Sequence, residues 1–315
     1  MGQPPVARIV LFWHFWIMPI AAGEARPSYN GWCRKRRTFM NHRVSRRRLL
    51  CGGTGAAGVG LLGFATGQTS RQRPRTLALI GDRYHNPDYI RVSLDRLFRE
   101  VGIPVDYTIL YDQLSRDLLK NYDLFVCLRD GMIWPNGYLG PDAYTDYEQR
   151  LENDFPEPKP ESWITEEQGA AVKEFVVAGG GFYSLHNNSH VSLSSKNYRE
   201  VMGGAYIGHP ALRPFQVRMV NKEHPITQGI QDFMVNDEQH FVAYDKDSKH
   251  VILESENLDG LEYENHGRKS VAGWAYPYGK GRVVFTAVGH TNHAMWVPAH
   301  FELQKRAVRW LLKQI

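Results

Sequence analysis

The sequence predicts an α/β protein built on a mostly parallel sheet. Short apolar runs such as RTLALIG (75–81) and DLFVCL (123–128) alternate with stretches whose apolar residues recur at helical spacing. This alternation is typical of βαβ units. With 43% hydrophobic residues in 315 positions, the chain can fill a complete core. We therefore expect one α/β domain over residues 75–315.

The expected elements follow in a regular order. The first five are a strand at 75–81, a helix at 88–102 closed by Gly102, a strand at 103–111, a short helix at 113–122 and a strand at 123–128. Thr165 then caps a helix that ends near residue 180, and GGGFYSLH forms the fourth strand. The remainder is mostly β, with strands at 214–220, 238–245, 250–256, 270–279 and 281–290 and a closing helix at 301–315.

Residues 131–163 interrupt this order. The segment is rich in acidic and aromatic residues and contains Pro135, Pro141, Pro156, Pro158 and Pro160. A connection of this length is either a lid over a site or a surface loop, and the sequence leaves both interpretations open.

The positive charge of the chain lies in its amino-terminal segment. Residues 1–75 contain 13 Lys and Arg against the single acid Glu24. Residues 76–315 therefore hold 25 basic and 32 acidic residues, a net charge of about −7, against +5 for the whole chain. This balance excludes a basic surface for phosphate backbones as the main feature, and we expect no nucleic-acid partner.

The same segment has the layout of a twin-arginine export signal. Arg46, Arg47 and Arg48 precede a glycine-rich, weakly apolar run of about 16 residues that ends in small residues near Gly67. We interpret residues 40–67 as the signal peptide, which predicts a periplasmic or secreted protein with the Tat translocase as its transport partner. The alternative is an uncleaved signal that acts as a membrane anchor, although the run is shorter than the ~20 residues needed to span a bilayer.

The start of the chain has two interpretations. MNHRVSRRRLL, beginning at Met40, is an ordinary beginning for such a signal. We therefore interpret residues 1–39 as an over-extended start and residues 68–74 as a linker, with a true start at Met1 as the alternative.

Cys127 is the one cysteine of the predicted domain, because Cys33 and Cys51 lie in the leader. No disulfide is therefore expected within the domain. Since Cys127 lies inside an apolar strand, we predict that it is a core residue.

Histidines follow several of the predicted strands. In GGGFYSLHNN (179–188), His186 occupies the strand-to-helix turn where many α/β enzymes carry a nucleophile. His209 follows GAYIG, His240 follows the acidic pair of NDEQH, and His290 follows the last strand. The carboxyl ends of parallel strands line the ligand crevice, so His186 and His290 converge if their strands are neighbours.

Two chemistries are open for this cluster. Neutral imidazoles together with a carboxylate bind zinc or a similar divalent ion, with His186, His209 and His290 as the candidate ligands. Alternatively, His186 and Glu238 act as acid and base without a metal. A thiol nucleophile is disfavoured because the turn carries histidine. No HExxH, paired CxxC or GxGxxG motif decides between the two.

Aromatic residues lie beside the same segments. Trp134, Trp274, Tyr276 and Trp296 are close in sequence to the candidate site, and flat apolar rings beside polar groups suit the faces of sugars. We take Trp274 and Trp296 as candidate substrate contacts, with a core position as the alternative for Trp274 because it lies inside a strand.

Five motifs occur together and in order: AAVKEFVVAGGGFYSLHNN, YREVMGGAYIGHP, HPITQGI, NDEQH and YGKGRVVFTAVGH. As a set they resemble the ThuA-like, trehalose-utilisation family over roughly residues 75–315. The resemblance implies a flavodoxin-like three-layer α/β/α sandwich similar to class I glutamine amidotransferases, with the nucleophile cysteine replaced. It also implies a role in the use of disaccharides or oxidised sugars.

The sequence departs from the family pattern in two places. Arg129 and Asp130 stand after the third strand, where family members often have histidine, and the 131–163 segment is longer and more acidic than expected. Both departures leave the substrate open.

These observations together predict an exported protein that acts on a sugar or keto-sugar at a His/Glu site. The candidate catalytic residues are His186, His209, Glu238 and His290, and the candidate substrate contacts are Asp130, Asn187, Trp274 and Trp296. The expected partners are a small carbohydrate and a sugar oxidoreductase of the same pathway. The alternative is a non-catalytic carbohydrate-binding or partner-docking domain, in which the histidines are dispersed.

Overall fold

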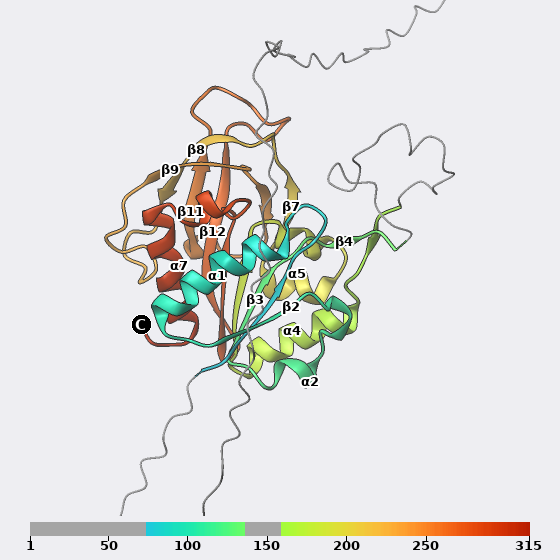
Figure 1. Cartoon of the computed structure of the whole chain (residues 1–315). Coiled ribbons are helices and arrows are strands. Elements are labelled where there is room, and N and C mark those ends of the chain that lie inside the picture. Colours follow the sequence, from blue (N-terminus) through green and yellow to red (C-terminus); the bar gives the residue numbers. More distant parts are fainter. Residues whose placement is uncertain (1–73, 136–158) are drawn as a thin grey trace, which may run out of the picture. The chain divides into compact units, whose positions relative to one another are not determined.

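Five parallel strands form the half of the central sheet that carries the candidate site. The computed structural model describes residues 74–135 and 159–315. The parallel strands lie in the order β2-β1-β3-β6-β13 (Figure 1). Their bounds are Val105–Thr108 (β2), Thr76–Ile80 (β1), Leu124–Leu128 (β3), Gly181–Leu185 (β6) and Gly281–Thr286 (β13). The prediction of an α/β fold with a mostly parallel sheet is confirmed.

Four antiparallel strands extend the sheet beyond β13 in the order β12-β11-β8-β9. Their bounds are Lys269–Tyr278 (β12), Val251–Glu256 (β11), Arg213–Met219 (β8) and Phe233–Asp237 (β9). In a flat sheet β9 would lie about 19 Å from β13, because neighbouring strands are ~4.8 Å apart. The carboxylate of Asp237 nevertheless accepts a hydrogen bond from the backbone N–H of Gly289, at 2.7 Å. The antiparallel half therefore curves back over the carboxyl end of β13.

A separate two-stranded ribbon lies beside the site. Its strands are β7 (Gly204–Gly208) and β10 (Phe241–Tyr244). They pair in antiparallel fashion with Gly208 opposite Phe241. Since His209 follows β7 and His240 precedes β10, this pairing places the two histidines next to each other.

The β-structure differs from the sequence prediction in three details. Neither β7 nor β9 was expected, because each has a short apolar run: β7 (GAYIG) begins and ends with glycine, and β9 (FMVND) ends in two polar residues. The strand expected at 238–245 begins only at Phe241, since residues 238–240 form the connection from β9 to β10.

Helices cover both faces of the sheet, as the family resemblance implied. Helices α1, α6 and α7 pack together on one face, and α2, α4 and α5 pack on the other (Figure 1). Their bounds are Pro87–Val101 (α1), Arg116–Leu119 (α2), Glu166–Ala178 (α4), Lys196–Met202 (α5), Asn292–Met295 (α6) and Pro298–Leu311 (α7). Short 3₁₀ segments occupy Tyr111–Gln113, His186–Leu193 and Ser248–His250.

The helix ends follow the signals in the sequence. Thr165 and Gln168 form a capping box at the start of α4, in which each side chain bonds the backbone N–H of the other residue. At the end of α1, Gly102 has a φ of 73°, a left-handed conformation that glycine adopts without strain.

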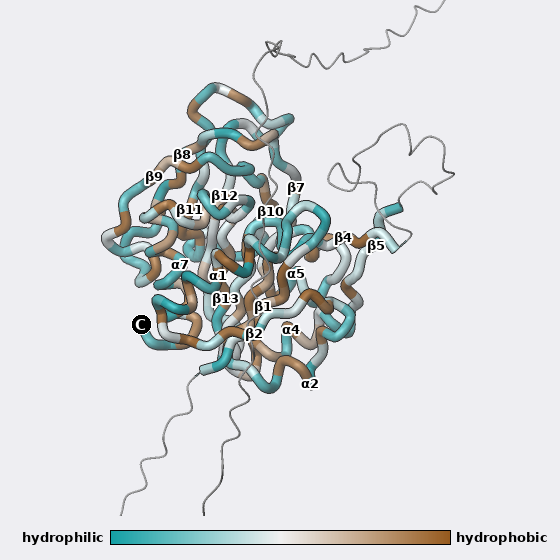
Figure 2. Tube along the Cα trace, in the orientation of Figure 1, coloured by the Kyte–Doolittle hydropathy of each residue, from teal (hydrophilic) through white to brown (hydrophobic). Residues whose placement is uncertain are grey.

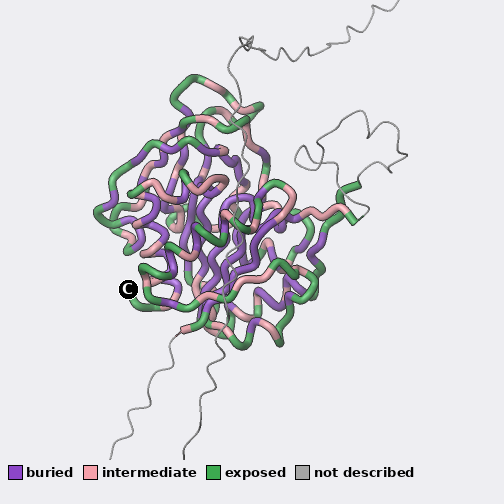
Figure 3. Tube along the Cα trace, in the orientation of Figure 1, coloured by how far each residue is buried: buried purple, intermediate pink, exposed green. Residues whose placement is uncertain are grey.

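The core lies between the sheet and the two helix layers. Figure 2 shows hydrophobic segments around β1 and β13, and Figure 3 shows that the central strands are buried. Strands β1 and β3 are buried along their whole length, and Cys127 in β3 is a core residue as predicted. The strands are thus a rigid support for the loops at their carboxyl ends.

Several sequence interpretations lie outside the described residues. These are the over-extended start (1–39), the signal peptide (40–67) and most of the linker (68–74). Only the ends of the 131–163 segment are described, and there β4 (Met132–Ile133) pairs with β5 (Glu161–Ser162). Within the described ranges, no helix combines the length and the apolar character that a membrane crossing requires.

Candidate functional site

The turn after β6 carries His186 in a strained conformation. Its φ of 50° lies in the left-handed region, at a cost of about 1–3 kcal/mol for a non-glycine residue. The ring is fully buried, and its Nδ1–H donates to the carbonyl oxygen of Ala287 at 2.7 Å. Since a carbonyl oxygen only accepts, the proton of the neutral ring lies on Nδ1 and Nε2 is unprotonated.

The turn after β13 places His290 beside His186, because β6 and β13 are parallel neighbours. The carboxylate of Asp237 fixes this turn by accepting hydrogen bonds from the backbone N–H groups of Gly289, at 2.7 Å, and His290, at 3.1 Å. Glycine is required at position 289, since a Cβ there would lie 2.8 Å from the Cβ of His186. The two histidines therefore approach each other at the carboxyl ends of neighbouring strands.

The loop after β1 adds His85, whose Nδ1–H donates to the carboxylate of Asp82 at 2.9 Å. Burial raises the pKa of Asp82, but the hydrogen bonds from His85 and Asn187 lower it by more, to about 2. The ionised Asp82 thus orients the ring, and Nε2 of His85 lies 3.1 Å from Nδ1 of His290.

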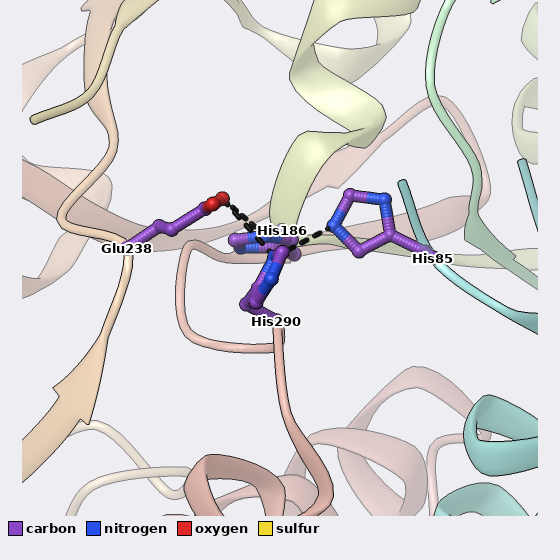
Figure 4. A group of neighbouring side chains, drawn as sticks. All are labelled: His85, His186, Glu238 and His290. Atoms are coloured by element: carbon purple, nitrogen blue, oxygen red, sulfur yellow. Dashed lines mark hydrogen bonds and ion pairs between the residues drawn. The ribbon is translucent and has the colours of Figure 1, made fainter. Parts of the chain in front are cut away.

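Glu238 lies at the centre of the histidine group. Its Oε2 is 3.1 Å from Nδ1 of His290 and 3.4 Å from Nε2 of His186. It is also 3.6 Å from Nε2 of both His209 and His240. Burial raises the pKa of Glu238, whereas the surrounding histidines lower it by more, so the carboxylate is ionised. Figure 4 shows Glu238 and His85 on opposite sides of His290.

The ribbon places His209 and His240 against Glu238. The Nδ1–H of His209 donates to the carbonyl oxygen of Pro210 at 2.9 Å, so its Nε2 is unprotonated in the neutral ring. His240 is 1% exposed, and neither of its ring nitrogens has a hydrogen-bond partner among the described residues. The rings of His186, His240 and His209 are stacked, with successive centroids 4.0 and 5.1 Å apart.

Within this cluster, the contact between His186 and Glu238 has no proton to share, whereas Glu238 raises the pKa of His290. Burial lowers the pKa of His186, and it lowers that of His240 well below the ordinary value, so both rings are neutral at pH 7. The unprotonated Nε2 of His186 thus faces the ionised carboxylate of Glu238 with no proton between them. A positive ion between the two removes this repulsion, and imidazole and carboxylate are ligands that zinc prefers.

Six side chains offer ligand atoms for such an ion, in two sets that share Glu238. The first set is His85, His186, Glu238 and His290, and the second is His209, Glu238 and His240. Within each set all ligand atoms lie within 4.8 Å of one another. Two ligands about 2.1 Å from a tetrahedral ion are ~3.4 Å apart, and the closest contacts of the first set, 3.1 to 3.4 Å, are near that spacing.

The cluster opens into a cavity of about 950 Å³ that is also lined by Asp130, His190 and three tyrosines, Tyr84, Tyr89 and Tyr206. Burial raises the pKa of Asp130 to about 6. Its Oδ1 lies 3.7 Å from Nδ1 of His190. The cavity therefore combines a group of metal-type ligands with a carboxyl group that exchanges protons near neutral pH.

Most of the residues predicted for the site lie in the cluster or on the cavity. His186, His209, Glu238 and His290 are brought together, whereas Asp130 and Asn187 line the cavity. The non-catalytic alternative required dispersed histidines, whereas the structure brings these histidines together.

The two tryptophans require a correction. Trp274 is fully buried in β12 and donates its Nε1–H to the carbonyl oxygen of Met202 at 2.8 Å, so its prediction as a substrate contact is wrong. Trp296 does not line the cavity; it packs against the guanidinium of Arg96, 5.0 Å from the ring centroid.

Asp82 and His85 were not predicted for the site, and His240 was grouped with the histidines near strand ends but was given no role there. Asp82 and His85 lie in DRYHNP, directly after β1, and polar residues at the carboxyl end of a parallel strand are a signal that could have identified them. His240 owes its position to the β7–β10 pairing, which no local pattern in the sequence indicated.

The sequence profile of the ThuA family, described as trehalose utilisation, matches residues 79–311. This chain belongs to the ThuA family. The membership supports a role related to trehalose utilisation. No curated protein matches the chain.

Solved ThuA-like structures share the fold of this ThuA protein. One, from Parabacteroides merdae, is 17% identical with a TM-score of 0.56, and the match covers 77% of this chain and 91% of that one. Another, from Bacteroides uniformis, is 15% identical with a TM-score of 0.53, covering 79% of this chain and 95% of that one. At these identities the likeness establishes the fold alone.

Proposed function

We propose that this ThuA protein is a metal-dependent enzyme that acts on a sugar or keto-sugar. The ligands of a zinc-type ion are His85, His186, Glu238 and His290. One observation carries the proposal: the unprotonated Nε2 of His186 lies 3.4 Å from the ionised carboxylate of Glu238, an arrangement that a cation stabilises. The Asp82–His85 pair supports it, because metal-binding histidines commonly donate their other N–H to a carboxylate or a carbonyl.

The expected chemistry combines this ion with an acid on the cavity wall. When bound, a divalent ion polarises a carbonyl group or lowers the pKa of a bound water. Asp130 shares the cavity and has a pKa of about 6, so it gives and takes protons during turnover. Nδ1 of His190 lies 3.7 Å from Oδ1 of Asp130 on the same cavity wall. Such a site suits proton abstraction beside a carbonyl, or opening of a glycosidic link in an oxidised sugar.

This assignment gives His186 and Glu238 the role of ligands. The sequence had offered both residues as an acid and base without metal. We favour the ligand role because both ring nitrogens of His186 already have a neighbour. Nδ1–H donates to the carbonyl oxygen of Ala287, and Nε2 faces the carboxylate of Glu238.

A carbohydrate substrate is supported by the family and by the cavity. The family is described by trehalose utilisation, and the rings of Tyr84, Tyr89 and Tyr206 line a cavity that also carries polar groups. Aromatic rings beside polar groups suit the apolar faces and hydroxyls of sugars. The volume of about 950 Å³ lies in the range of pockets that enclose small ligands.

The metal is tested by elemental analysis of the mature domain, purified without affinity metals. We expect a stoichiometric divalent ion in the wild type and its loss in His186→Ala and His290→Ala. His293→Ala is the matched control, since His293 belongs to the same GHTNH motif but is exposed, and it should retain the ion. A wild type that binds no divalent ion, even after incubation with Zn²⁺, overturns the proposal.

The reaction is tested with a panel of disaccharides and 3-keto sugars. We expect turnover that depends on the added ion and that falls above about pH 6 as Asp130 loses its proton. In Asp130→Asn, turnover should no longer fall as the pH rises above about 6. If the protein binds these sugars with its metal loaded but converts none of them, the non-catalytic alternative is correct.

We also propose export by the twin-arginine route and a pathway shared with a sugar oxidoreductase. Twin-arginine transport carries folded proteins, so the metal site would form before export. Mass spectrometry of the mature amino terminus tests this: cleavage near Gly67 is the expected result, and an intact leader on the exported protein contradicts it.

A further inference from the structure

Two histidines beside Glu238 form a second group of ligand atoms. Nε2 of His209 and Nε2 of His240 each lie 3.6 Å from Oε2 of Glu238. They belong to the β7–β10 ribbon, whereas the three histidines of the proposed zinc-type site follow the parallel strands β1, β6 and β13. The two groups therefore reach Glu238 from different parts of the fold.

Both nitrogens are suited to bind a cation. The Nδ1–H of His209 is held by the Pro210 carbonyl at 2.9 Å, which leaves Nε2 unprotonated. His240 is 1% exposed and has no hydrogen-bond partner for either ring nitrogen within residues 74–135 and 159–315. Buried polar groups are nearly always satisfied, and a cation between Nε2 of His240 and Glu238 would satisfy this nitrogen at the 3.6 Å separation of the two atoms.

A single ion does not use all of these side chains. Ligand atoms about 2.1 Å from one ion can be at most ~4.2 Å apart. The six side chains instead form two close sets that have only Glu238 in common. The rings of His186, His240 and His209 are stacked, with centroids 4.0 and 5.1 Å apart, and the Nε2 atom of each ring lies 3.4 to 3.6 Å from Oε2 of Glu238.

We propose that Glu238 bridges two divalent ions, and that His209 and His240 hold the second one. This inference rests on the proposed function and extends it from one ion to two. Paired ions about 3.5–4 Å apart are common in enzymes that bind two oxygen atoms of a substrate.

The second ion has the fewer protein ligands, and both of its histidines line the cavity. Its remaining positions are therefore open to oxygen ligands from that side. An α-hydroxyketone, as in a 3-keto sugar, presents a hydroxyl and a carbonyl oxygen on adjacent carbons and fits such a pair of ions.

The experiment counts ions in the mature domain. Apoprotein is loaded with Zn²⁺ alone and the bound metal is counted after gel filtration. A parallel sample loaded with Mn²⁺ is examined by electron paramagnetic resonance. We expect two ions per chain in the wild type, with magnetic coupling between the Mn²⁺ ions, and one uncoupled ion in the double variant His209→Ala/His240→Ala. His190→Ala removes another cavity histidine that lies outside both sets and should retain two.

The possible outcomes separate this inference from the proposed function. One ion in both the wild type and the double variant overturns the second site and leaves the single-ion enzyme standing. Two ions in the folded double variant also overturn it, because the second ion then binds elsewhere. A wild type without any ion overturns both proposals. Because His240 is buried, its replacement also removes core packing. The single variant His209→Ala therefore serves as a second test, and circular dichroism checks that each variant is folded.

Discussion

His300 on α7 should make the stability of this protein depend on pH. The side chain is fully buried, and its Nδ1–H donates to the carbonyl oxygen of Ala294 at 3.0 Å. Burial lowers the pKa of His300 from 6.5 to about 4. The imidazole therefore stays neutral in the folded protein at pH values where it is charged in the unfolded chain.

The sign and size follow from this difference in pKa. The folded state has its full stability above pH 6.5 and loses part of it as the pH falls from 6.5 toward 4, because only the unfolded chain takes up the proton. At pH 5 this uptake favours the unfolded state by about 2 kcal/mol. We predict that the stability lost between pH 8 and pH 5 is smaller by about 2 kcal/mol in His300→Asn than in the wild type.

The assay is urea unfolding followed by tryptophan fluorescence at several pH values. Excess chelator is present throughout, so that pH-dependent metal binding does not contribute. The asparagine amide replaces the Nδ1 donor but cannot titrate. His293→Asn, at an exposed position of α6, controls for the loss of a histidine. An identical pH dependence in His300→Asn and the wild type would refute the reasoning.

Three further predictions follow from described contacts. Asp82→Asn should weaken Zn²⁺ binding about 10–100-fold in competition with a chelating dye, because His85 loses its charged acceptor; unchanged affinity would remove Asp82 from the metal support. Thr165→Ala should lower the free energy of unfolding by about 1 kcal/mol in urea, since the α4 capping box is lost; a stability within error of the wild type would contradict this. Gly289→Ala should cost about 1–3 kcal/mol in the same assay and reduce the bound metal, because its Cβ meets His186 at 2.8 Å; full metal content would show that the turn adapts freely.

The sequence predicted the parts of the fold that local patterns determine. Alternating apolar runs and helical periods located the parallel strands and their helices, and Thr165 and Gly102 marked helix ends correctly. His186 and His290 were expected to converge on one condition, that their strands are neighbours, and β6 and β13 are neighbours in the sheet. The carboxyl ends of neighbouring parallel strands lie at the same edge of the sheet, so the residues that follow these strands meet there.

The rest of the site depends on long-range geometry. Glu238 reaches the cluster because the antiparallel half of the sheet curves, as the Asp237–Gly289 hydrogen bond shows, and no local pattern encodes that curvature. Trp274 was misassigned because a tryptophan in a strand has the same sequence signature whether it faces a cavity or, as here, the core.

The curvature of the sheet also affects the mechanics of the domain. Asp237 and Glu238 connect the curved edge to the parallel half. His85 and His290, which contact each other, follow β1 and β13 and lie 205 residues apart in the sequence. An ion held by His85, Glu238 and His290 would fasten three remote parts of the chain at one point, as a cross-link does. Metal binding would then strengthen the cooperativity of the whole domain, and the site would be complete only after the last strand has joined the sheet.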